Sequence, residues 1–414
     1  MAFDLIVWVI YLFSLYYGVF WFLVYLDYGS KDQQNIYKNS PLVTIAIPAY
    51  NEEESIAATI DSVTSLDYPK DKMEILVIND GSKDKTAEIV NSVIQKNKGY
   101  KILLINQQNT GKGAAMNNAL KQAAGEFFIS LDADSYVRSD ALKVIMPYFD
   151  NPEVSCVLPL IKVKNPKTIM QKLQYVEYLV NFFYKKLMSK LDCIHVTPGP
   201  FSVYKTNVLR KLGGFDENNL TEDLEMALRL QKHHYKIEQI LGTEVLTDAP
   251  VNFKTFYKQR NRWYKGSLIN VWNYRNILFN RKYGEFGMFH LPAVFSVAVI
   301  AIIYVTYILS KYIFKPTINY ITDASYINFN VPFMMSKTLE DISFLDFNYM
   351  TMFLGLSIIA ISLLILRNAF TFTKERMRNA LFASSMFLVF YPSLLAITWM
   401  GVVFDLVRGK RQKW

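Results

Sequence analysis

One apolar segment near the N-terminus constrains the fold of this chain more than any other feature. No residue from Leu5 to Leu26 is charged, and the segment is long enough for a helix to cross a bilayer. It lacks the basic start and the small-residue cleavage site of a signal peptide. We therefore interpret it as a retained membrane anchor.

Three further apolar segments lie after the middle of the chain, and they predict a multi-pass membrane protein. They cover residues 286–310, 349–366 and 380–405. Hydrophobic residues make up 51 % of the sequence, which is high for a soluble chain. We divide the chain into an N-terminal transmembrane helix (1–30), a globular domain (38–263), an amphipathic helix on the membrane surface (264–285) and a C-terminal transmembrane region of about three spans (286–414).

The positive charge indicates which partners the chain binds. The formal net charge is +9, and basic residues cluster beside the apolar segments. They include Arg275, Arg281, Lys282, Arg367, Lys374, Arg376, Arg378, Arg408, Lys410, Arg411 and Lys413. This distribution is typical of residues that face anionic headgroups on the cytosolic side of a membrane. The sequence contains no motif for DNA or RNA recognition, so we expect a lipid bilayer and no nucleic acid as partner.

The globular domain alternates apolar strands with helices, which predicts an α/β fold. Strands are expected at 42–50, 74–80, 101–105 and 126–131, and helices at 51–62, from 84, at 113–123 and at 224–232. This order favours a Rossmann-like, mostly parallel sheet. Such sheets bind ligands at the carboxyl ends of their strands, where Asn79, Asp80, Asp132 and Asp134 are expected.

Several of these polar residues have both a structural and a chemical interpretation. Asp132 and Asp134 either form a solvated turn or hold a divalent cation such as Mg²⁺ or Mn²⁺, which can bridge a diphosphate. Asp80 either stabilises a turn or hydrogen-bonds a nucleobase or ribose. Lys112 lies in a glycine-containing segment at the start of a helix, where it can approach a phosphate.

Two later motifs are ambiguous in the same way. Thr221-Glu222-Asp223 begins a helix, and its acids either interact with the helix dipole or supply a general base. The segment 259–263 precedes the membrane region. Its Arg262 and Trp263 either anchor the chain at the membrane interface or bind a phosphate and the face of a sugar ring.

The order of these motifs resembles the processive branch of glycosyltransferase family 2, which includes the hyaluronan, chitin, cellulose and poly-N-acetylglucosamine synthases. The similarity rests on P-x-Y-N-E after the first strand, D-G-S after the second, G-K near the third, D-x-D after the fourth, T-E-D, and Q-x-x-R-W. The matching motifs cover about residues 42–263. In the remainder of the chain, the similarity rests on the arrangement of the predicted membrane spans. The single leading span looks most like the bacterial poly-N-acetylglucosamine synthases. The resemblance implies a GT-A catalytic domain.

The resemblance also implies a role for each matching residue. Asp223 matches the catalytic base, and Asp132 and Asp134 match the metal ligands, with Asp134 the more direct one. The implied substrate-binding residues are Asp80 at the uracil-ribose part of the donor, Lys112 and Asn117 near the donor, Glu222 in T-E-D, and Gln259, Arg262 and Trp263 around the diphosphate and the acceptor sugar. The segment Pro198-Gly199-Pro200-Phe201 matches only loosely and is not assigned a role.

The implied function is processive, inverting β-glycosyl transfer from a nucleotide sugar to a growing glycan, coupled to membrane passage. UDP-N-acetylglucosamine is the favoured donor. One alternative is non-processive transfer to a polyprenyl phosphate or another lipid, against which Q-x-x-R-W argues. Another is a non-catalytic scaffold or transporter subunit, against which the retained carboxylates argue. The sequence leaves open the sugar, the linkage and any accessory subunit.

The same resemblance predicts a topology that conflicts with the charge distribution. Because nucleotide sugars are cytosolic, the globular domain is expected in the cytosol of a multi-pass cell-membrane protein, with the N-terminus outside. Four simple spans then place residues 408–413 outside, against the positive-inside rule. A re-entrant hairpin, broken at Tyr391-Pro392, is one way to remove the conflict. The side of the C-terminus is left open.

Overall fold

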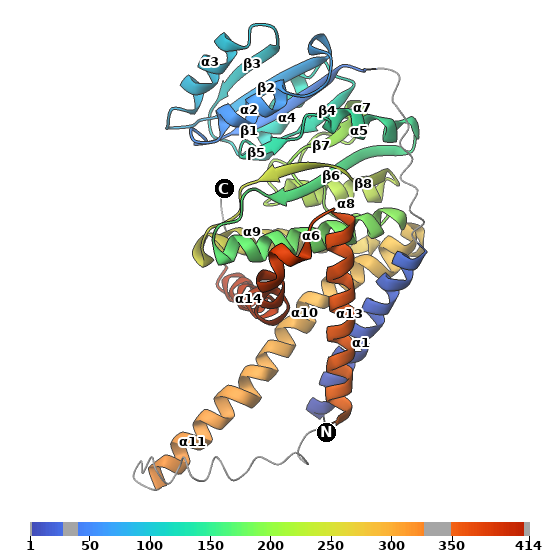
Figure 1. Cartoon of the computed structure of the whole chain (residues 1–414), viewed down its shortest axis with the longest axis vertical. Coiled ribbons are helices and arrows are strands. Elements are labelled where there is room, and N and C mark those ends of the chain that lie inside the picture. The colour runs from blue at the N-terminus through green and yellow to red at the C-terminus, as the bar shows by residue number, and fades with distance from the viewer. Residues whose placement is uncertain (1, 28–39, 327–348, 410–414) are drawn as a thin grey trace.

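The computed structural model of the chain describes residues 2–27, 40–326 and 349–409. An α/β domain lies at one end, and long helices extend from the other (Figure 1). Helices α6 (Ile169–Lys190) and α9 (Phe253–Asn273) lie between these two parts. The predicted combination of an α/β domain with apolar helices is confirmed.

The domain is built on one mixed sheet of eight strands in the order β3-β2-β1-β4-β7-β6-β8-β5. The strands are β1 (Val43–Ala49), β2 (Met73–Asp80), β3 (Lys101–Gln107), β4 (Phe127–Ser130), β5 (Ser135–Val137), β6 (Val154–Val163), β7 (Ser202–Lys205) and β8 (Lys236–Thr247). The run β3-β2-β1-β4 is parallel, and so is the β6–β8 pair. The β4–β7, β6–β7 and β5–β8 pairs are antiparallel. The sheet is Rossmann-like in its first half and mixed beyond it.

The parallel strands bring the polar residues to one edge of the sheet. Every residue of β2 and β4 is buried, as expected where helices cover both faces of a parallel sheet. The register pairs Ala49 with Asn79 and Asp80 with Gln107. The loops after β1 to β4 therefore emerge together, as the sequence predicts.

The helices of the domain pack around this sheet. They are α2 (Ile56–Thr64), α3 (Thr86–Lys96), α4 (Lys112–Gln122), α5 (Ala141–Ile145), α7 (Thr206–Lys211) and α8 (Glu222–Lys232). The first of them begins five residues after the predicted start at Asn51. Asn51 has a φ of 56°, which an α-helix cannot include, so the chain turns before Ile56 and only then becomes helical.

The apolar segments form long helices. They are α1 (Ala2–Leu26), α10 (Leu291–Ile308), α13 (Tyr349–Phe372) and α14 (Leu381–Val407), and the shorter, more polar α11 (Lys315–Tyr326) follows α10. Within the described residues, three segments are long and apolar enough to cross a membrane: Trp8–Leu26, Met352–Phe372 and Leu381–Val407. The span predicted at 286–310 consists of a π-helical turn, Phe286–His290, followed by α10. Residues 327–348, between the second and third predicted spans, lie beyond the described residues.

Helix α14 differs from the hairpin that the sequence suggested. It runs without a break through Pro392, so the break expected at Tyr391-Pro392 is wrong. Its first half packs on α6, where Ala383 joins a cluster with Val176 and Leu179. Near its middle, the ring of Tyr391 lies 6.1 Å from that of Phe256 on α9.

The far end of α14 also contacts the domain. Lys265 on α9 and Asp405 form an ion pair with 2.7 Å between Nζ and Oδ2. The rings of Tyr264 and Trp399 stack at 4.3 Å. Helix α14 therefore has α6 or α9 beside it from one end to the other, whereas α13 packs on α1 and α6 and extends away from the domain (Figure 1).

The amphipathic helix that the sequence places at 264–285 is the second half of a longer helix. Helix α9 begins at Phe253, where the Asn252 side chain caps it by accepting a hydrogen bond from the backbone N–H of Thr255. It ends at Asn273, and two short 3₁₀ turns, Arg275–Ile277 and Arg281–Tyr283, follow. The whole Q-x-x-R-W motif therefore lies inside α9.

Candidate active site

Asp80, at the end of β2, organises the loop that begins α4. Its Oδ1 accepts hydrogen bonds from the backbone N–H of Thr110 at 2.9 Å and from Gln107 Nε2 at 2.8 Å. Its Oδ2 accepts one from the backbone N–H of Gly111 at 2.9 Å. The buried Asp80 thus fixes the residues directly before Lys112.

Lys112 connects two carboxylates that are far apart in the sequence. Its Nζ lies 2.6 Å from Asp132 Oδ1 and 3.3 Å from Glu222 Oε1. Burial favours a lower pKa for this amine, but Asp132, Glu222 and Asp223 together raise the Lys112 pKa above its ordinary value. Lys112 is therefore a permanent positive charge between D-x-D and T-E-D.

Asp134 lies in an environment with unbalanced negative charge. Burial first, and then the carboxylates of Asp132 and Glu52, raise the Asp134 pKa to about 7. Lys112 opposes this rise only in part. Two carboxylates that repel each other at a strand end are suitable ligands for a divalent cation. Among the residues that the structure describes, no cluster of three or more His, Cys, Asp or Glu side chains has the geometry of a metal site.

Gly199 closes one side of this group, and the sequence analysis did not assign it a role. A Cβ atom at Gly199 would lie 2.5 Å from both Asp132 Oδ1 and Lys112 Nζ, so a larger residue there would displace this ion pair. The Gly199 carbonyl also accepts a hydrogen bond from Ser130 Oγ at 2.8 Å. The two prolines that flank Gly199 in the sequence were the available signal for this contact.

The T-E-D motif lies in the first turn of α8. Glu222 is buried, and its pKa is raised by burial and by Asp223 against the lowering effects of Lys112 and Arg262. Asp223 is half-buried, and its Oδ1 accepts a hydrogen bond from the backbone N–H of Leu224 at 2.8 Å. The carbonyl of Asp223 accepts one from Thr197 Oγ1, also at 2.8 Å. These contacts hold the motif against the segment that leads to Gly199.

In the Q-x-x-R-W motif, a residue that sequence reasoning missed supports the tryptophan. The guanidinium of Arg260 lies 4.2 Å from the ring centre of Trp263. Arg260 is buried and pairs with Glu177 on α6, with 2.6 Å between Nη2 and Oε2. Gln259, Arg262 and Trp263 are half-buried. No family motif in the sequence marked Arg260 or Glu177.

Asn117 has partners other than those the resemblance implied. Its Nδ2 donates to the carbonyl of Phe215 and to Glu217 Oε1, both at 2.8 Å, and its Oδ1 accepts from the backbone N–H of Phe215 at 2.7 Å. The amide is thus engaged by the segment 215–217. Asn117 therefore orders this segment, and its placement near the donor stays a prediction.

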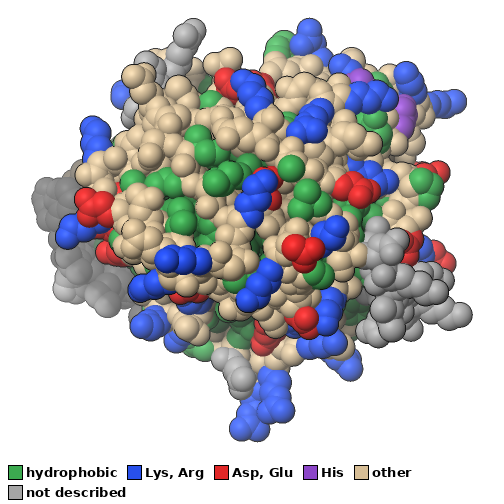
Figure 2. Space-filling model, turned by 90° about the horizontal axis from the view of Figure 1, so that it is seen from above, with side chains coloured by type: hydrophobic (Ala, Val, Ile, Leu, Met, Phe, Trp, Pro, Cys, Tyr) green, Lys and Arg blue, Asp and Glu red, His purple; other side chains and the backbone are tan. Residues whose placement is uncertain are grey.

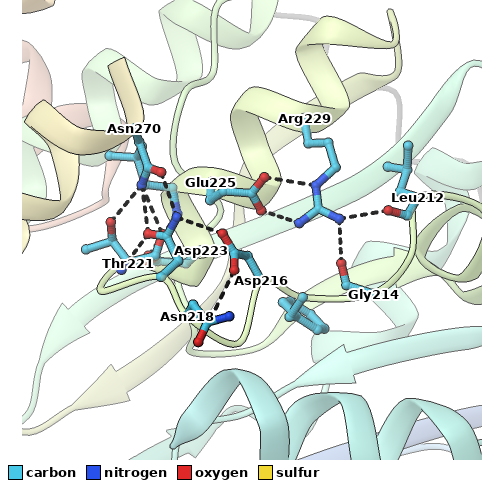
Figure 3. Close-up of polar contacts among 12 residues, drawn as sticks. Leu212, Gly214, Asp216, Asn218, Thr221, Asp223, Glu225, Arg229 and Asn270 are labelled. Atoms are coloured by element: carbon cyan, nitrogen blue, oxygen red, sulfur yellow. Dashed lines mark hydrogen bonds and ion pairs between the residues drawn. The ribbon is translucent and has the colours of Figure 1, made fainter. Parts of the chain in front are cut away.

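An open hollow of about 510 Å³ lies beside Asn117, but it is not where the catalytic groups gather. Its lining is Asn117, Gly213, Phe215, Asp216, Glu217, Asn218, Glu225 and Arg229. Arg229 is already bound to Glu225 and to the carbonyls of Leu212 and Gly214 (Figure 3). None of Lys112, Asp132 or Asp134 lines this hollow, so we place the active site at the strand ends instead.

On the outer face of the domain, charges of both signs are mixed. Figure 2 shows Lys and Arg side chains around the rim and between Asp and Glu side chains, with small apolar areas among them. No single basic surface dominates this face (Figure 2).

Comparison with known proteins finds a family profile that matches most of the domain. The profile of Glycosyl transferase family 2 matches residues 44–213. The poly-beta-1,6-N-acetyl-D-glucosamine synthase of Staphylococcus epidermidis is 32 % identical over 226 residues, which is 54 % of each chain. The chain thus spans about half the length of this relative. The probable glycosyltransferase YdaM of Bacillus subtilis is 28 % identical over 67 % of this chain and 68 % of its own.

A solved structure shares the fold. The mannosyltransferase PcManGT from Pyrobaculum calidifontis, in complex with GDP-Man and Mn²⁺, has a TM-score of 0.56 and 19 % sequence identity. The match covers 80 % of this chain and 91 % of the mannosyltransferase. At this identity the similarity is one of fold, and it confirms the GT-A assignment.

Proposed function

We propose that the chain is a processive, inverting β-glycosyltransferase of family 2 that is embedded in a membrane; the family profile matches residues 44–213. Its donor is a nucleotide sugar, UDP-N-acetylglucosamine or a related UDP-sugar, and its acceptor is a growing polysaccharide. The similarity to a poly-β-1,6-N-acetylglucosamine synthase and the presence of long apolar helices support this proposal.

One observation carries the proposal: Lys112 lies within 3.3 Å of both Asp132 and Glu222. It joins the D-x-D strand end to the helix that starts with T-E-D. A donor diphosphate near Lys112 would have its sugar close to Asp223. This arrangement suits transfer between a phosphate leaving group and an acceptor hydroxyl.

The chemical step follows from the residues at this junction. Asp223 accepts the proton of the acceptor hydroxyl while the hydroxyl oxygen attacks the anomeric carbon. The bond from that carbon to the diphosphate breaks, and the diphosphate departs with the electron pair. Lys112 and Arg262 balance its charge. Attack from the side opposite to the leaving group gives a β-linked product from an α-linked donor.

Asp132 and Asp134 are the residues that would hold Mg²⁺ or Mn²⁺. Their fit rests on the raised pKa of Asp134, which reflects burial and the neighbouring carboxylates of Asp132 and Glu52. A bound cation would supply positive charge against the diphosphate. On the acceptor side, we assign the face of a sugar ring to Trp263, held by Arg260, and a hydroxyl contact to Gln259, whose buried Oε1 has no hydrogen-bond partner among the described residues.

The contacts of α14 also support a topology. Because α14 lies beside α6 or α9 over its whole length, we propose that it rests on the domain side of the membrane and does not cross. Segment 286–310 and α13 then cross in opposite directions. The catalytic domain and residues 367–378 and 408–413 are all cytosolic, which satisfies the positive-inside rule.

A panel of nucleotide sugars tests the function. The purified protein, in lipid nanodiscs with Mg²⁺ or Mn²⁺, is given UDP-, GDP- and TDP-sugars, and nucleotide release and product mass are measured. We expect polymer from one UDP-sugar. Sugar on a lipid without polymer would indicate the non-processive alternative, and absence of nucleotide release with every donor would refute the enzyme assignment.

Single-cysteine labelling tests the topology. Cys156 and Cys193 are both buried and free, and they are replaced first. Single cysteines are then introduced as Ser82→Cys and Arg408→Cys in separate protein variants. Whole cells that express each variant are labelled. We expect an impermeant reagent to label neither position until the membrane is opened. Labelling of Arg408→Cys alone in intact cells would make α14 a span.

A further inference from the structure

Helix α9 presents one face to the catalytic groups, and the Q-x-x-R-W motif is only the first half of that face. Residues three and four positions apart lie on the same side of a helix. Gln259, Arg262, Trp263, Gly266 and Asn270 follow this spacing. The motif residues therefore share a face with two residues that no family motif marks.

Gly266 lets the backbone of α9 touch Thr221, which directly precedes Glu222 and Asp223. A Cβ atom at Gly266 would lie 2.3 Å from Thr221 Oγ1 and 2.6 Å from Thr221 Cγ2. Any larger side chain would push the two helices apart, because both atoms belong to a short, buried side chain. The helix that carries Arg262 thus approaches the start of α8 as closely as packing allows.

One turn later, Asn270 binds Thr221 and Asn219 with all of its polar atoms. It is fully buried. Its Nδ2 donates to Thr221 Oγ1 at 3.0 Å and to Asn219 Oδ1 at 3.1 Å, and its Oδ1 accepts from Asn219 Nδ2 at 2.7 Å. The Asn219 Oδ1 also accepts from the backbone N–H of Thr221 at 3.1 Å.

The two amides thus form a closed pair around Thr221. Figure 3 shows Asn270 and Thr221 beside Asp223. A fully satisfied network of buried polar groups fixes one geometry, because every alternative leaves a donor or acceptor without a partner. A leucine of similar size could fill the space but could not set this orientation.

We propose that Asn270, together with Gly266, is a positioning residue that sets the place of Asp223 relative to Arg262 and Trp263. This inference rests on the proposed function, in which Asp223 is the base and α9 binds the diphosphate and acceptor. Asn270 itself is not proposed to touch the donor or the acceptor. It acts through Thr221, and it makes the base and the acceptor-binding helix move as one unit.

The test compares Asn270→Ala with Asn273→Ala, which removes an exposed asparagine at the end of the same helix. With UDP-N-acetylglucosamine and Mg²⁺ in nanodiscs, we expect kcat of Asn270→Ala to fall roughly tenfold to a hundredfold, because small misplacements of reacting groups cost about that much. KM for the donor and the Kd for UDP should stay within about twofold, since the donor-binding groups at the sheet edge and Arg262 itself are unchanged. Asn273→Ala should match the wild type.

A second variant keeps the test decisive if Asn270→Ala folds poorly. Thr221→Val keeps the shape of the side chain and removes the acceptor for Asn270 Nδ2. Its kcat should fall by a similar factor, and the Asn270→Ala/Thr221→Val double variant should lose little more than either single variant. Fully additive losses, or equal losses in kcat and in UDP affinity, would overturn the positioning role. A wild-type kcat in either single variant would do the same.

These outcomes separate the inference from the function on which it rests. If the wild type releases no nucleotide from any donor, the proposed function fails. If the wild type turns over and Asn270→Ala keeps the full kcat, only the positioning role fails.

Discussion

The two halves of the candidate site are held in place by different interactions. The sheet-edge half consists of Asp80, Lys112, Asp132 and Asp134. Most of these follow buried strands, so backbone hydrogen bonds between β1, β2, β3 and β4 set their positions. The helical half consists of Asp223, Gln259, Arg262 and Trp263, and it depends on side chains that join α8, α9, α6 and α14.

This difference has a consequence for substitutions. A backbone ladder survives the loss of any one side chain, so variants at the sheet edge should lose chemistry and keep geometry. The helical half relies on a few buried polar contacts, such as Asn270 with Thr221 and Arg260 with Glu177. A conservative change there can displace a group that it does not touch.

The largest expected effect is at Asp223. Asp223→Asn keeps the size of the side chain and removes its basicity, so we expect transfer to fall by roughly 10²- to 10⁴-fold while UDP still binds. Nucleotide release and calorimetric binding of UDP measure the two properties. Asp61→Asn, an exposed carboxylate on α2, is the control. A nearly normal rate of chain extension would make Asp223 only a helix-terminal charge.

Substitution of Asp134 should weaken UDP binding as well as transfer, because Asp134 belongs to the sheet-edge half. Asp134→Asn is expected to lower activity by roughly a hundredfold or more and to weaken UDP binding in the presence of Mg²⁺ or Mn²⁺. Excess chelator should stop the wild type, and added Mg²⁺ or Mn²⁺ should restore it. Asp150→Asn, also exposed, is the control. Full wild-type turnover in excess chelator would exclude the metal role.

Trp263 should affect the polymer more than the donor. In Trp263→Ala, loss of the stacking surface should reduce acceptor engagement by roughly tenfold, while hydrolysis of the donor continues. Product length by gel electrophoresis and free sugar by chromatography report the two outcomes. Trp272→Ala is the matched control, because Trp272 lies on the same helix and is 68 % exposed. If both variants make polymer of normal length and yield, Trp263 is an interface anchor.

The smallest expected effect concerns the support beneath α9. Asp405→Asn leaves the buried Lys265 without its carboxylate partner, which should destabilise the protein by about 2 kcal/mol. We expect a lower melting temperature and roughly a threefold loss of polymer synthesis, through the altered position of α9. Arg408→Gln, one turn further along, should change neither. Unchanged stability in Asp405→Asn would mean that α14 does not hold the helical half.

The sequence predicts the sheet-edge half well for a physical reason. Buried parallel strands are recognisable as apolar runs, and whatever follows them must emerge at the carboxyl edge. The sequence alone therefore places Asp80, Asp132 and Asp134 at this edge. The first helix was expected five residues too early, because a left-handed Asn51 leaves no signature in apolar periodicity.

The helical half could be recognised from motifs but not assembled from them. Arg260 and Glu177 are 83 positions apart, and nothing in either segment shows that they meet. Asn117 has the position of a family residue, yet its amide binds residues 215–217. Gly199 and Gly266 are needed because distant residues pack against them. Asp132 and Lys112 lie against Gly199, and Thr221 lies against Gly266.

By itself, the sequence determined the α/β sheet, the order of the catalytic motifs and the presence of long apolar helices, because each depends on local periodicity or on residues adjacent in the chain. Only the tertiary structure decided which of those helices extend from the domain and which lies along it. Helices α13 and α14 have nearly the same mean hydropathy, 2.0 and 1.9, but α14 packs on α6 and α9 along its whole length. Hydropathy records the apolar surface of a helix but not its direction relative to the domain, which the contacts of α14 with α6 and α9 set.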